Sequence, residues 1–459
     1  KLGNILTLTY PDGFQLTYSY DALDRVKTAG CYATFTYRLD DRVDTINYGN
    51  GVKTTYSYDS RSRPTRILTK LNSLTLLDLN YTYDGEGNVL GVNTETYWYD
   101  DLDRLTGSSG PWGSISYTYD AVGNRLTKTE GSTMNYEYGP CNKLTRAGST
   151  TYTYDANGNL ATRNDGTNTW TYNYDYENHL TQVKKNSQTI AQYVYDGDGQ
   201  RIKKTEDTIT QIHIYQSLNI IYEKFANNGT IIKRVYGSGF QLVEIQGGGV
   251  RYLHQDFLGS TRLVSDSSGV VRFSSSYRPF GPSHGESGYE THKYTGKPQD
   301  SATALYYFGA RYYDPEIGRF ITQDPGTARL TEPQTLNRYV YSVNNPLRYV
   351  DPNGAEHLAP GDIKDFLDWN KEYAESVVPP EQRPLVYGAL TVTLVGVLAA
   401  AAAPAAVAAA PIVKGALVAG GGWLAERAAA AKDWVVEKAH NAWNALKGWF
   451  TGSKAQVTA

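Results

Sequence analysis

Cysteine and methionine are scarce in this chain of 459 residues, which has two of the first and one of the second. Cys31 and Cys141 lie far apart and match no CxxC spacing, so the sequence predicts no thiolate metal site and no redox pair. One disulfide between them stays open, but we expect two unpaired thiols. The formal net charge is only −3, without long blocks of one sign, so no electrostatic footprint for nucleic acid is expected.

Catalytic and targeting motifs are also lacking. His357 and His440 are the only histidines after residue 354, and no HExxH, HNH or Cys/His cluster occurs there, which disfavours a nuclease, deaminase or metalloprotease. We therefore predict no cofactor and no metal ion. No signal peptide opens the chain, since Lys1 begins in the middle of the repeat pattern, as in a fragment of a longer polypeptide.

Tyrosine, by contrast, occurs 39 times, against 11 phenylalanines and 8 tryptophans. Together with Thr, Asn, Asp and Gly, it favours twisted strands joined by tight turns over long helices. The dipeptide Tyr-Asp or a close variant recurs about every twenty residues, about ten times, which is too regular for chance. The copies begin at Tyr20, Tyr37, Tyr58, Tyr83, Tyr99, Tyr119, Tyr138, Tyr154, Tyr174 and Tyr195.

Residues 151–163 show what one repeat is expected to build. The first half alternates Thr and Tyr, so one face of the strand carries rings and the other hydroxyls. Asp155 is placed to accept backbone N–H groups ahead of it, and Asn157-Gly158 supplies positive-φ residues for a tight hairpin turn. One hairpin cannot bury its tyrosine face alone, so neighbouring hairpins must stack, and accumulated twist makes the long sheet curl. The repeats thus predict a spiral sheet around an enclosed space, although tyrosine rows that stack on sugars remain an alternative.

A non-repeating block follows from residue 251. Its most distinctive stretches are YLHQDFLGSTR at 252–262, LYYFGARYYDPEIGRF at 305–320 and NRYVYSVNNPLRYVDPNG at 337–354. With the Tyr-Asp repeats, this block resembles the RHS/YD-repeat superfamily, which comprises Rhs polymorphic toxins, the C components of Tc toxins, wall-associated toxins and teneurins. The resemblance implies a hollow β-cocoon that wraps a C-terminal cargo, with the block closing the C-terminal end of the shell.

Two Asp-Pro steps in the block, at Asp324 and Asp351, suggest catalysis. In the resembled family, the corresponding pair looks like an aspartyl protease that cuts its own chain once, just after the second motif. The resemblance thus implies a single-turnover cut near Gly354–Glu356. Such chemistry needs two carboxylates that share a proton, one to activate water and the other to protonate the carbonyl or leaving amine. We expect Arg319 to bias the protonation of this pair.

The Asp-Pro steps also depart from the family pattern. The first reads Asp-Pro-Gly-Thr where the family has Asp-Pro-x-Gly, the spacing between Asp324 and Asp351 is longer than usual, and Ala355 replaces a large apolar residue. The structural alternative is that both steps only form turns, with Asp capping and Pro setting φ.

After Gly354 the composition changes abruptly. Residues 362–376 predict a short amphipathic helix, and residues 385–413 carry no charged side chain, a length that can span a bilayer, for which about 20 apolar residues suffice. Residues 423–450 predict a tryptophan-rich amphipathic helix suited to a membrane interface. An alanine-rich helical hairpin stowed inside the shell is the alternative reading.

The sequence therefore predicts a mainly β protein with three parts. YD-repeat hairpins at 1–250 form part of a spiral, hollow cocoon, an RHS core at 251–354 closes it, and a variable α-helical region occupies 355–459. We expect the shell of a polymorphic toxin, secreted or at the cell surface, that encloses and delivers its C-terminal effector segment. The expected partners are this segment as cargo, a secretion apparatus, an immunity protein and a membrane contacted through 385–450. The alternative is a cell-surface adhesion scaffold that binds glycans and is anchored by its hydrophobic tail.

Overall fold

The structure is a computed structural model that describes residues 4–326 and 333–358. The chain divides into two units, Lys1–Tyr373 and Ala374–Ala459, and all described residues belong to the first. The helices predicted between 362 and 450, and the membrane contact assigned to them, lie outside the described residues. In the part that is described, no helix has the length and apolar character needed to cross a bilayer.

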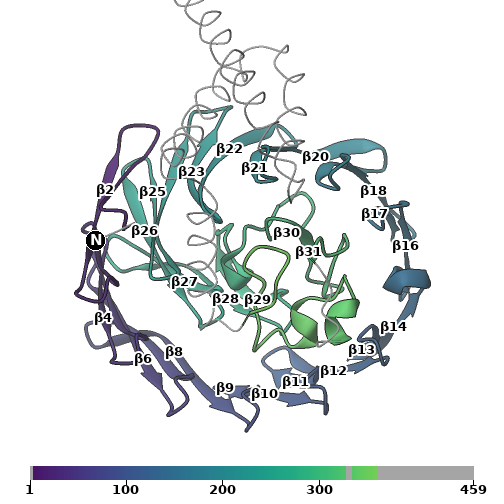
Figure 1. The fold of residues 1–459 in the computed structure, drawn as a ribbon, viewed down its shortest axis with the longest axis horizontal. Coiled ribbons are helices and arrows are strands. Elements are labelled where there is room, and N and C mark those ends of the chain that lie inside the picture. The colour runs from purple at the N-terminus through teal and green to yellow at the C-terminus, as the bar shows by residue number, and fades with distance from the viewer. Residues whose placement is uncertain (1–3, 327–332, 359–459) are drawn as a thin grey trace, which may run out of the picture. The chain divides into compact units, whose positions relative to one another are not determined.

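Most of the described residues form one long antiparallel sheet, called the wall here, in which each strand pairs with the next along the chain (Figure 1). This arrangement confirms the prediction of a mainly β fold. The strands of the wall are β1 Thr7–Thr9, β2 Gln15–Tyr20, β3 Val26–Ala29, β4 Ala33–Tyr37, β5 Val43–Tyr48, β6 Val52–Tyr58, β7 Pro64–Leu71, β8 Leu74–Tyr83, β9 Val89–Val92, β10 Glu95–Tyr99, β11 Leu105–Gly110, β12 Gly113–Tyr119, β13 Arg125–Glu130, β14 Ser132–Tyr138, β15 Leu144–Ala147, β16 Thr150–Tyr154, β17 Leu160–Asn164, β18 Thr169–Tyr174, β19 Leu180–Lys185, β20 Gln188–Tyr195, β21 Arg201–Glu206, β22 Ile209–Gln216, β23 Asn219–Phe225, β24 Ile231–Gly237, β25 Phe240–Gln246, β26 Gly249–Gln255, β27 Thr261–Asp266, β28 Val271–Tyr277 and β29 Ser283–Gly288.

Each Tyr-Asp step begins a turn that the aspartate organises. In the repeat at Asp120, one carboxylate oxygen accepts the N–H groups of Val122 and Asn124 at 3.0 and 2.8 Å. The equivalent turn at 155–159 shows one difference from the expected geometry: Gly158 has a positive φ of 84°, whereas Asn157 is not among the positive-φ residues. A β-bulge before Tyr154 widens the connection, so it is a bulged turn closed by the aspartate and not a two-residue hairpin.

The tyrosine of the step ties its hairpin to the preceding one. Its hydroxyl donates a hydrogen bond of 2.6–3.0 Å to the carbonyl oxygen of the first residue of the previous return strand. Phenylalanine cannot make this bond, which explains the abundance of tyrosine. The pairs of donor and acceptor are Tyr37 and Val26, Tyr58 and Val43, Tyr83 and Pro64, Tyr99 and Val89, Tyr119 and Leu105, Tyr138 and Arg125, Tyr174 and Leu160, and Tyr195 and Leu180.

The curled sheet brings its first strands against β24, five strands before its end, as twist accumulated over many strands allows. The hydroxyls of Tyr10 and Tyr18 donate to the carbonyl oxygens of Arg234 and Tyr236 in β24, at 2.8 and 2.9 Å. Figure 1 shows β2 and β4 beside β25 and β26. Buried side chains of these strands form one continuous hydrophobic cluster, so the main core lies between successive turns of the spiral.

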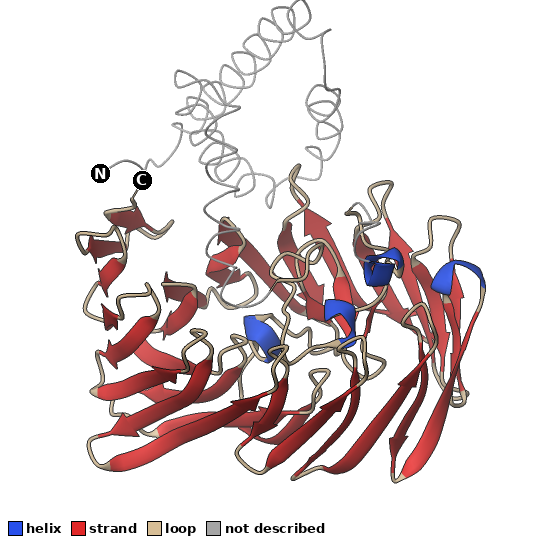
Figure 2. Ribbon diagram, turned by 60° about the horizontal axis from the view of Figure 1, so that its bottom comes forward, coloured by secondary structure: helices blue, strands red, loops and turns tan. Residues whose placement is uncertain are grey.

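The chain after β29 leaves the wall and forms a compact block on the concave side of the sheet (Figures 1 and 2). It contains three short strands and three 3-10 turns, and a fourth 3-10 turn, η1 Pro140–Asn142, belongs to the wall. Its aromatic side chains pack into a cluster of their own. The predicted domain boundary at residue 250 falls inside β26, and the wall continues to Gly288. The elements of the block are β30 Tyr306–Tyr307, β31 Tyr312–Asp314, β32 Arg319–Phe320, η2 Tyr294–Gly296, η3 Pro333–Leu336 and η4 Ser342–Asn344.

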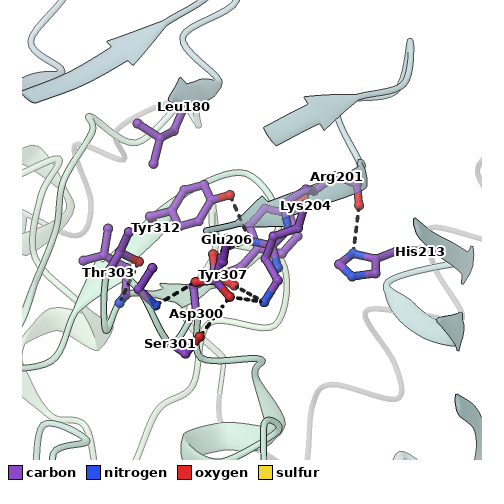
Figure 3. A network of polar contacts seen from close by, with 12 residues as sticks. Leu180, Arg201, Lys204, Glu206, His213, Asp300, Ser301, Thr303, Tyr307 and Tyr312 are labelled. Carbon is purple, nitrogen blue, oxygen red and sulfur yellow. Dashed lines mark hydrogen bonds and ion pairs between the residues drawn. The ribbon is translucent and has the colours of Figure 1, made fainter. Parts of the chain in front are cut away.

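A buried ionic cluster fastens the block to β21 of the wall (Figure 3). Asp300, which is fully buried, lies 2.5 Å from Arg201 Nη1 and 3.1 Å from Lys204 Nζ. Beside it, Glu206 accepts hydrogen bonds from the hydroxyl of Ser301 and from the next backbone N–H, at 3.1 and 2.8 Å. Burial alone raises the pKa of Asp300, but the two cations outweigh this effect and hold the pKa below its usual value. The block is thereby fixed to the wall by paired charges out of contact with water.

Replacing Asp300 by Asn should destabilise the protein by roughly 3–5 kcal/mol, because Arg201 and Lys204 would lose a buried counter-charge. The matched control is Asp78→Asn, which breaks a pair with Arg66 whose side chains are 32% and 44% exposed and should cost less than about 1 kcal/mol. Chemical denaturation measures both. Equal losses in the two variants would contradict this description of the block–wall contact.

Candidate functional site

Asp324 and Asp351, the two aspartates predicted to be catalytic, come together in the block, and one arginine contacts both. Nη2 of Arg311 lies 2.9 Å from an oxygen of Asp324 and 3.0 Å from an oxygen of Asp351. Arg311 precedes β31, and Asp324 follows β32. Asp351 comes directly after Val350, which forms an isolated bridge with Leu358. The short sheet β30–β31–β32 orders residues 306–320, and the Asp351 turn joins it through the hydrogen bond from Ala310 N to Asn353 O at 2.9 Å. The result is a carboxylate pair that shares one guanidinium nitrogen.

The segment expected to be cut folds around Asp351. One oxygen of this carboxylate accepts the N–H groups of Gly354, Ala355 and Glu356, at 2.6, 3.0 and 3.2 Å. Nε of Arg311 donates to the carbonyl oxygen of Gly354 at 2.5 Å. Gly354 has a φ of 81°, and a Cβ there would lie 2.9 Å from the backbone nitrogen of Arg311, so only glycine fits. The Gly354–Ala355 peptide thus has its oxygen beside Arg311 and its nitrogen beside Asp351.

The two carboxylates differ in their surroundings. Asp351 is 1% exposed, whereas the side chain of Asp324 is 26% exposed. Burial raises the pKa of Asp351 above its usual value, and the positive charge of Arg311 offsets this only in part. Burial also lowers the pKa of Arg311, against the opposing effect of the two aspartates. Burial therefore favours the protonated form of Asp351.

Two cavities reach this cluster. A cavity of about 40 Å³ is bounded by Arg311, Asp324 and Asp351, together with Glu356. This volume is enough for at least one water molecule, which needs about 10–15 Å³ and polar partners. A larger cavity of about 450 Å³ lies between the wall turns and the block, and Asp324 and Pro352 are among its lining residues. Asp324 belongs to both, so it stands where water can approach the Asp351 turn.

Arg319, predicted to act on the aspartate pair, lies elsewhere. Its guanidinium donates to the side-chain oxygen of Asn124 and to the carbonyl oxygen of Asn142, at 3.2 and 2.7 Å. It also lies over the rings of Tyr138 and Tyr339, at 5.0 and 5.4 Å from their centroids. Arg319 therefore links β32 to the wall, and the arginine beside the aspartates is Arg311. Arg311 precedes β31 and Arg319 begins β32, and the sequence alone does not reveal which of the two faces the aspartates.

Across residues 4–326 and 333–358, one group of side chains has the spacing of metal ligands. Glu244, Glu290 and His292 are buried, with ligand atoms within 4.8 Å of one another. Arginines already pair with both carboxylates: Arg234 lies 3.1 Å from Glu244, and Arg251 lies 2.8 Å from Glu244 and 3.0 Å from Glu290. These contacts describe a buried ionic network between the wall and the block. The two cysteines are exposed and unpaired.

Comparison with known proteins shows which family carries this architecture. The Teneurin YD-shell family model matches residues 92–347, which is more than half of the chain. The chain belongs to the Teneurin YD-shell family. Among the relatives of this YD-shell chain, toxin subunit YenC2 of Yersinia entomophaga is 39% identical over 128 residues, covering 26% of this chain and 12% of YenC2. The tRNA3(Ser)-specific nuclease WapA of Bacillus spizizenii is 34% identical over 272 residues, covering 56% of this chain and 12% of WapA.

Solved structures support the same fold. The Photorhabdus luminescens Tc holotoxin pore with a mutated TccC3 matches the YD-shell chain with a TM-score of 0.67 at 24% identity, covering 78% of this chain and 21% of the other. At this identity, the match concerns the fold alone. The YD-shell chain spans about an eighth of the length of the curated relatives named here.

Replacing Arg311 by Met should cost roughly 3–5 kcal/mol near pH 7, because two carboxylates would lose their common cation. This loss of stability should become smaller as the pH is lowered toward 4. Without Arg311, the folded-state pKa of Asp351 lies further above its unfolded value, so the cost of ionisation is present above the unfolded pKa and disappears as the carboxyl is protonated. The control Arg319→Met removes contacts to amides and rings, so its loss should not shrink. Denaturation at both pH values decides, and the same pH dependence in both variants would refute the assignment of Arg311.

Proposed function

We propose that the chain is part of the shell of a polymorphic toxin, which encloses its own C-terminal segment and cuts that segment free once. The YD-shell family and its toxin relatives support the shell. The observation that carries the cut is Arg311, which contacts Asp324, Asp351 and the carbonyl oxygen of Gly354 at once. A pair of Asp-Pro turns with only a structural role would not need a shared cation beside the carbonyl oxygen of Gly354.

The geometry supports a direct hydrolysis of the bond between Gly354 and Ala355. Asp324 takes a proton from a water in the small cavity, and the water oxygen forms a bond to the Gly354 carbonyl carbon. Arg311 stabilises the negative charge that develops on the carbonyl oxygen. Asp351, whose protonated form is favoured by burial, gives its proton to the Ala355 nitrogen as the carbon–nitrogen bond breaks. The products are a Gly354 carboxylate and an Ala355 amine, and no further reactant is required.

The intact mass of the purified chain tests the cut. We expect a C-terminal fragment of roughly 11 kDa, since 50.9 kDa over 459 residues is about 0.11 kDa per residue, and its mass also identifies the broken bond. Asp351→Asn and Asp324→Asn should each leave the chain uncut, because Asn keeps an oxygen acceptor for the turn but cannot exchange the proton.

The control for this experiment is Asp120→Asn, at a wall aspartate that accepts backbone N–H groups in a similar turn. It should be cut like the wild-type chain. A wild-type chain that keeps its full mass after folding would rule out the cut, and fragments that persist in Asp351→Asn would show that another protease makes them.

The effector role of residues 355–459 rests on the apolar and tryptophan-rich stretches in that segment. The released fragment should make dye-loaded anionic liposomes leak, whereas the chain truncated after Gly354 should leave them intact. If the liposomes do not leak even at a high peptide-to-lipid ratio, a membrane-active effector is ruled out. Glycan binding by the truncated chain, with a harmless tail, would then favour the adhesion scaffold.

A further inference from the structure

A second basic side chain reaches the Asp351 turn. Nζ of Lys297 donates a hydrogen bond of 2.6 Å to the carbonyl oxygen of Pro352 and lies 5.7 Å from the centroid of the Phe308 ring. Pro352 comes directly after Asp351 and two residues before Gly354. Lys297 and Pro352 both line the cavity of about 450 Å³. The ammonium group thus holds the peptide that joins the buried aspartate to the bond proposed to be cut.

The backbone of Lys297 is fixed in turn by the wall. Lys297 closes the turn η2, with its carbonyl oxygen accepting from Lys293 N at 3.0 Å and its own N–H donating to Tyr294 O at 3.0 Å. The same turn rests on the wall connection between β26 and β27. Thr295 N donates to the Ser260 hydroxyl at 3.0 Å.

Close packing leaves this turn little freedom. A Cβ on Gly296 would lie 3.1 Å from the carbonyl oxygen of Gly259, so the two turns touch through their backbones. In addition, Thr261 N donates to Lys293 O at 2.9 Å. A continuous set of contacts therefore runs from the wall through η2 and the Lys297 side chain to the Asp351 turn.

We propose that Lys297 is a positioning residue for the single cut, holding the Asp351 turn in register with Arg311 only when η2 is docked on the wall. This inference rests on the proposed cut and adds an order to it: the block docks first and the chain is cleaved afterwards. The contact matters because small displacements of a reacting bond are costly, with a shift of about 1 Å reducing a rate by about 100-fold. Without Lys297, the Pro352 carbonyl oxygen loses its buried donor, and the turn keeps only its contacts to Asp351, to Arg311 and to Ala310 N.

The hydrogen bond from Lys297 depends on its charge. Burial lowers the pKa of Lys297 to about 8, against the opposing effect of Asp351. The other charged or titratable side chains around the cavity include His292, Asp324 and Arg338. A charged donor makes a bond roughly twice as strong as a neutral one. The positioning should therefore weaken, and the cleavage rate should fall, as pH rises through about 8. A purely structural role of the side chain would not make the cleavage rate depend on pH in this way.

The test is the rate of cleavage of the full chain as it folds after cell-free synthesis, measured from pH 6 to pH 9.5. The wild-type rate should fall above about pH 8, and Lys297→Met should be cut about 10-fold to 100-fold more slowly at pH 7, without this alkaline decline. Lys297→Arg should restore most of the rate and move the decline to higher pH, since arginine stays charged. Lys297→Gln, a neutral donor, should cleave slowly at every pH.

The matched control is Lys293→Met, in the same turn, which loses only a pair with Glu286 and should be cut at the wild-type rate. If Lys297→Met is cut as fast as the wild type, or keeps the same pH profile, the positioning role is wrong while the cut itself stands. If the wild-type chain is never cut, both proposals fail. Should Lys297→Met not fold, the Arg and Gln variants decide by the same criteria.

Discussion

The hydrogen bond from a tyrosine hydroxyl to the first carbonyl of the preceding return strand is the interaction on which the rest of the structure depends. A long meander of antiparallel strands has backbone bonds along every ladder, but these bonds do not set how sharply the sheet curls. The tyrosine ring packs against the buried core, and its hydroxyl reaches across to the previous hairpin, so each repeat fixes its angle to its neighbour. Because the bond recurs, the curvature accumulates until β2 and β4 meet β25 and β26 (Figure 1).

The block on the concave side is held to the wall by polar contacts with the turns of the wall. The Asp-organised turns present backbone carbonyls and amide side chains: Tyr339 donates to the Gly158 carbonyl, and Asn337 and Asn345 donate to the side chains of Asn124 and Asn88. Buried charges at Asp300 add a stronger and more specific attachment. Contacts of this kind are directional, so they fix one position of the block on the wall, whereas apolar packing alone would tolerate several. The candidate site inherits its geometry from that position.

Much of the fold follows from the sequence because the repeat is a local pattern. Alternating Thr and Tyr, followed by Asp and Gly, predicts strand, turn and face residue by residue, and the structure confirms these features apart from the bulged geometry of the turn at 155–159. The proximity of Asp324 and Asp351 came from resemblance and not from spacing. Arg311 could not be chosen over Arg319, since the two lie eight residues apart in the same motif and only the folded contacts show which one points to the aspartates. The hydrogen bond of Lys297 depends on a contact between segments 55 residues apart, which no local pattern encodes.

We propose that the wall and the block form a shell that retains residues 355–459 after they are cut. The most direct measurement is limited proteolysis of the purified protein, with size-exclusion chromatography before and after mild denaturation. Residues 355–459 should co-elute with residues 1–354, resist protease, and become sensitive only when the shell unfolds. A segment that separates from residues 1–354 under native conditions, or that protease digests while the wall stays intact, would contradict it.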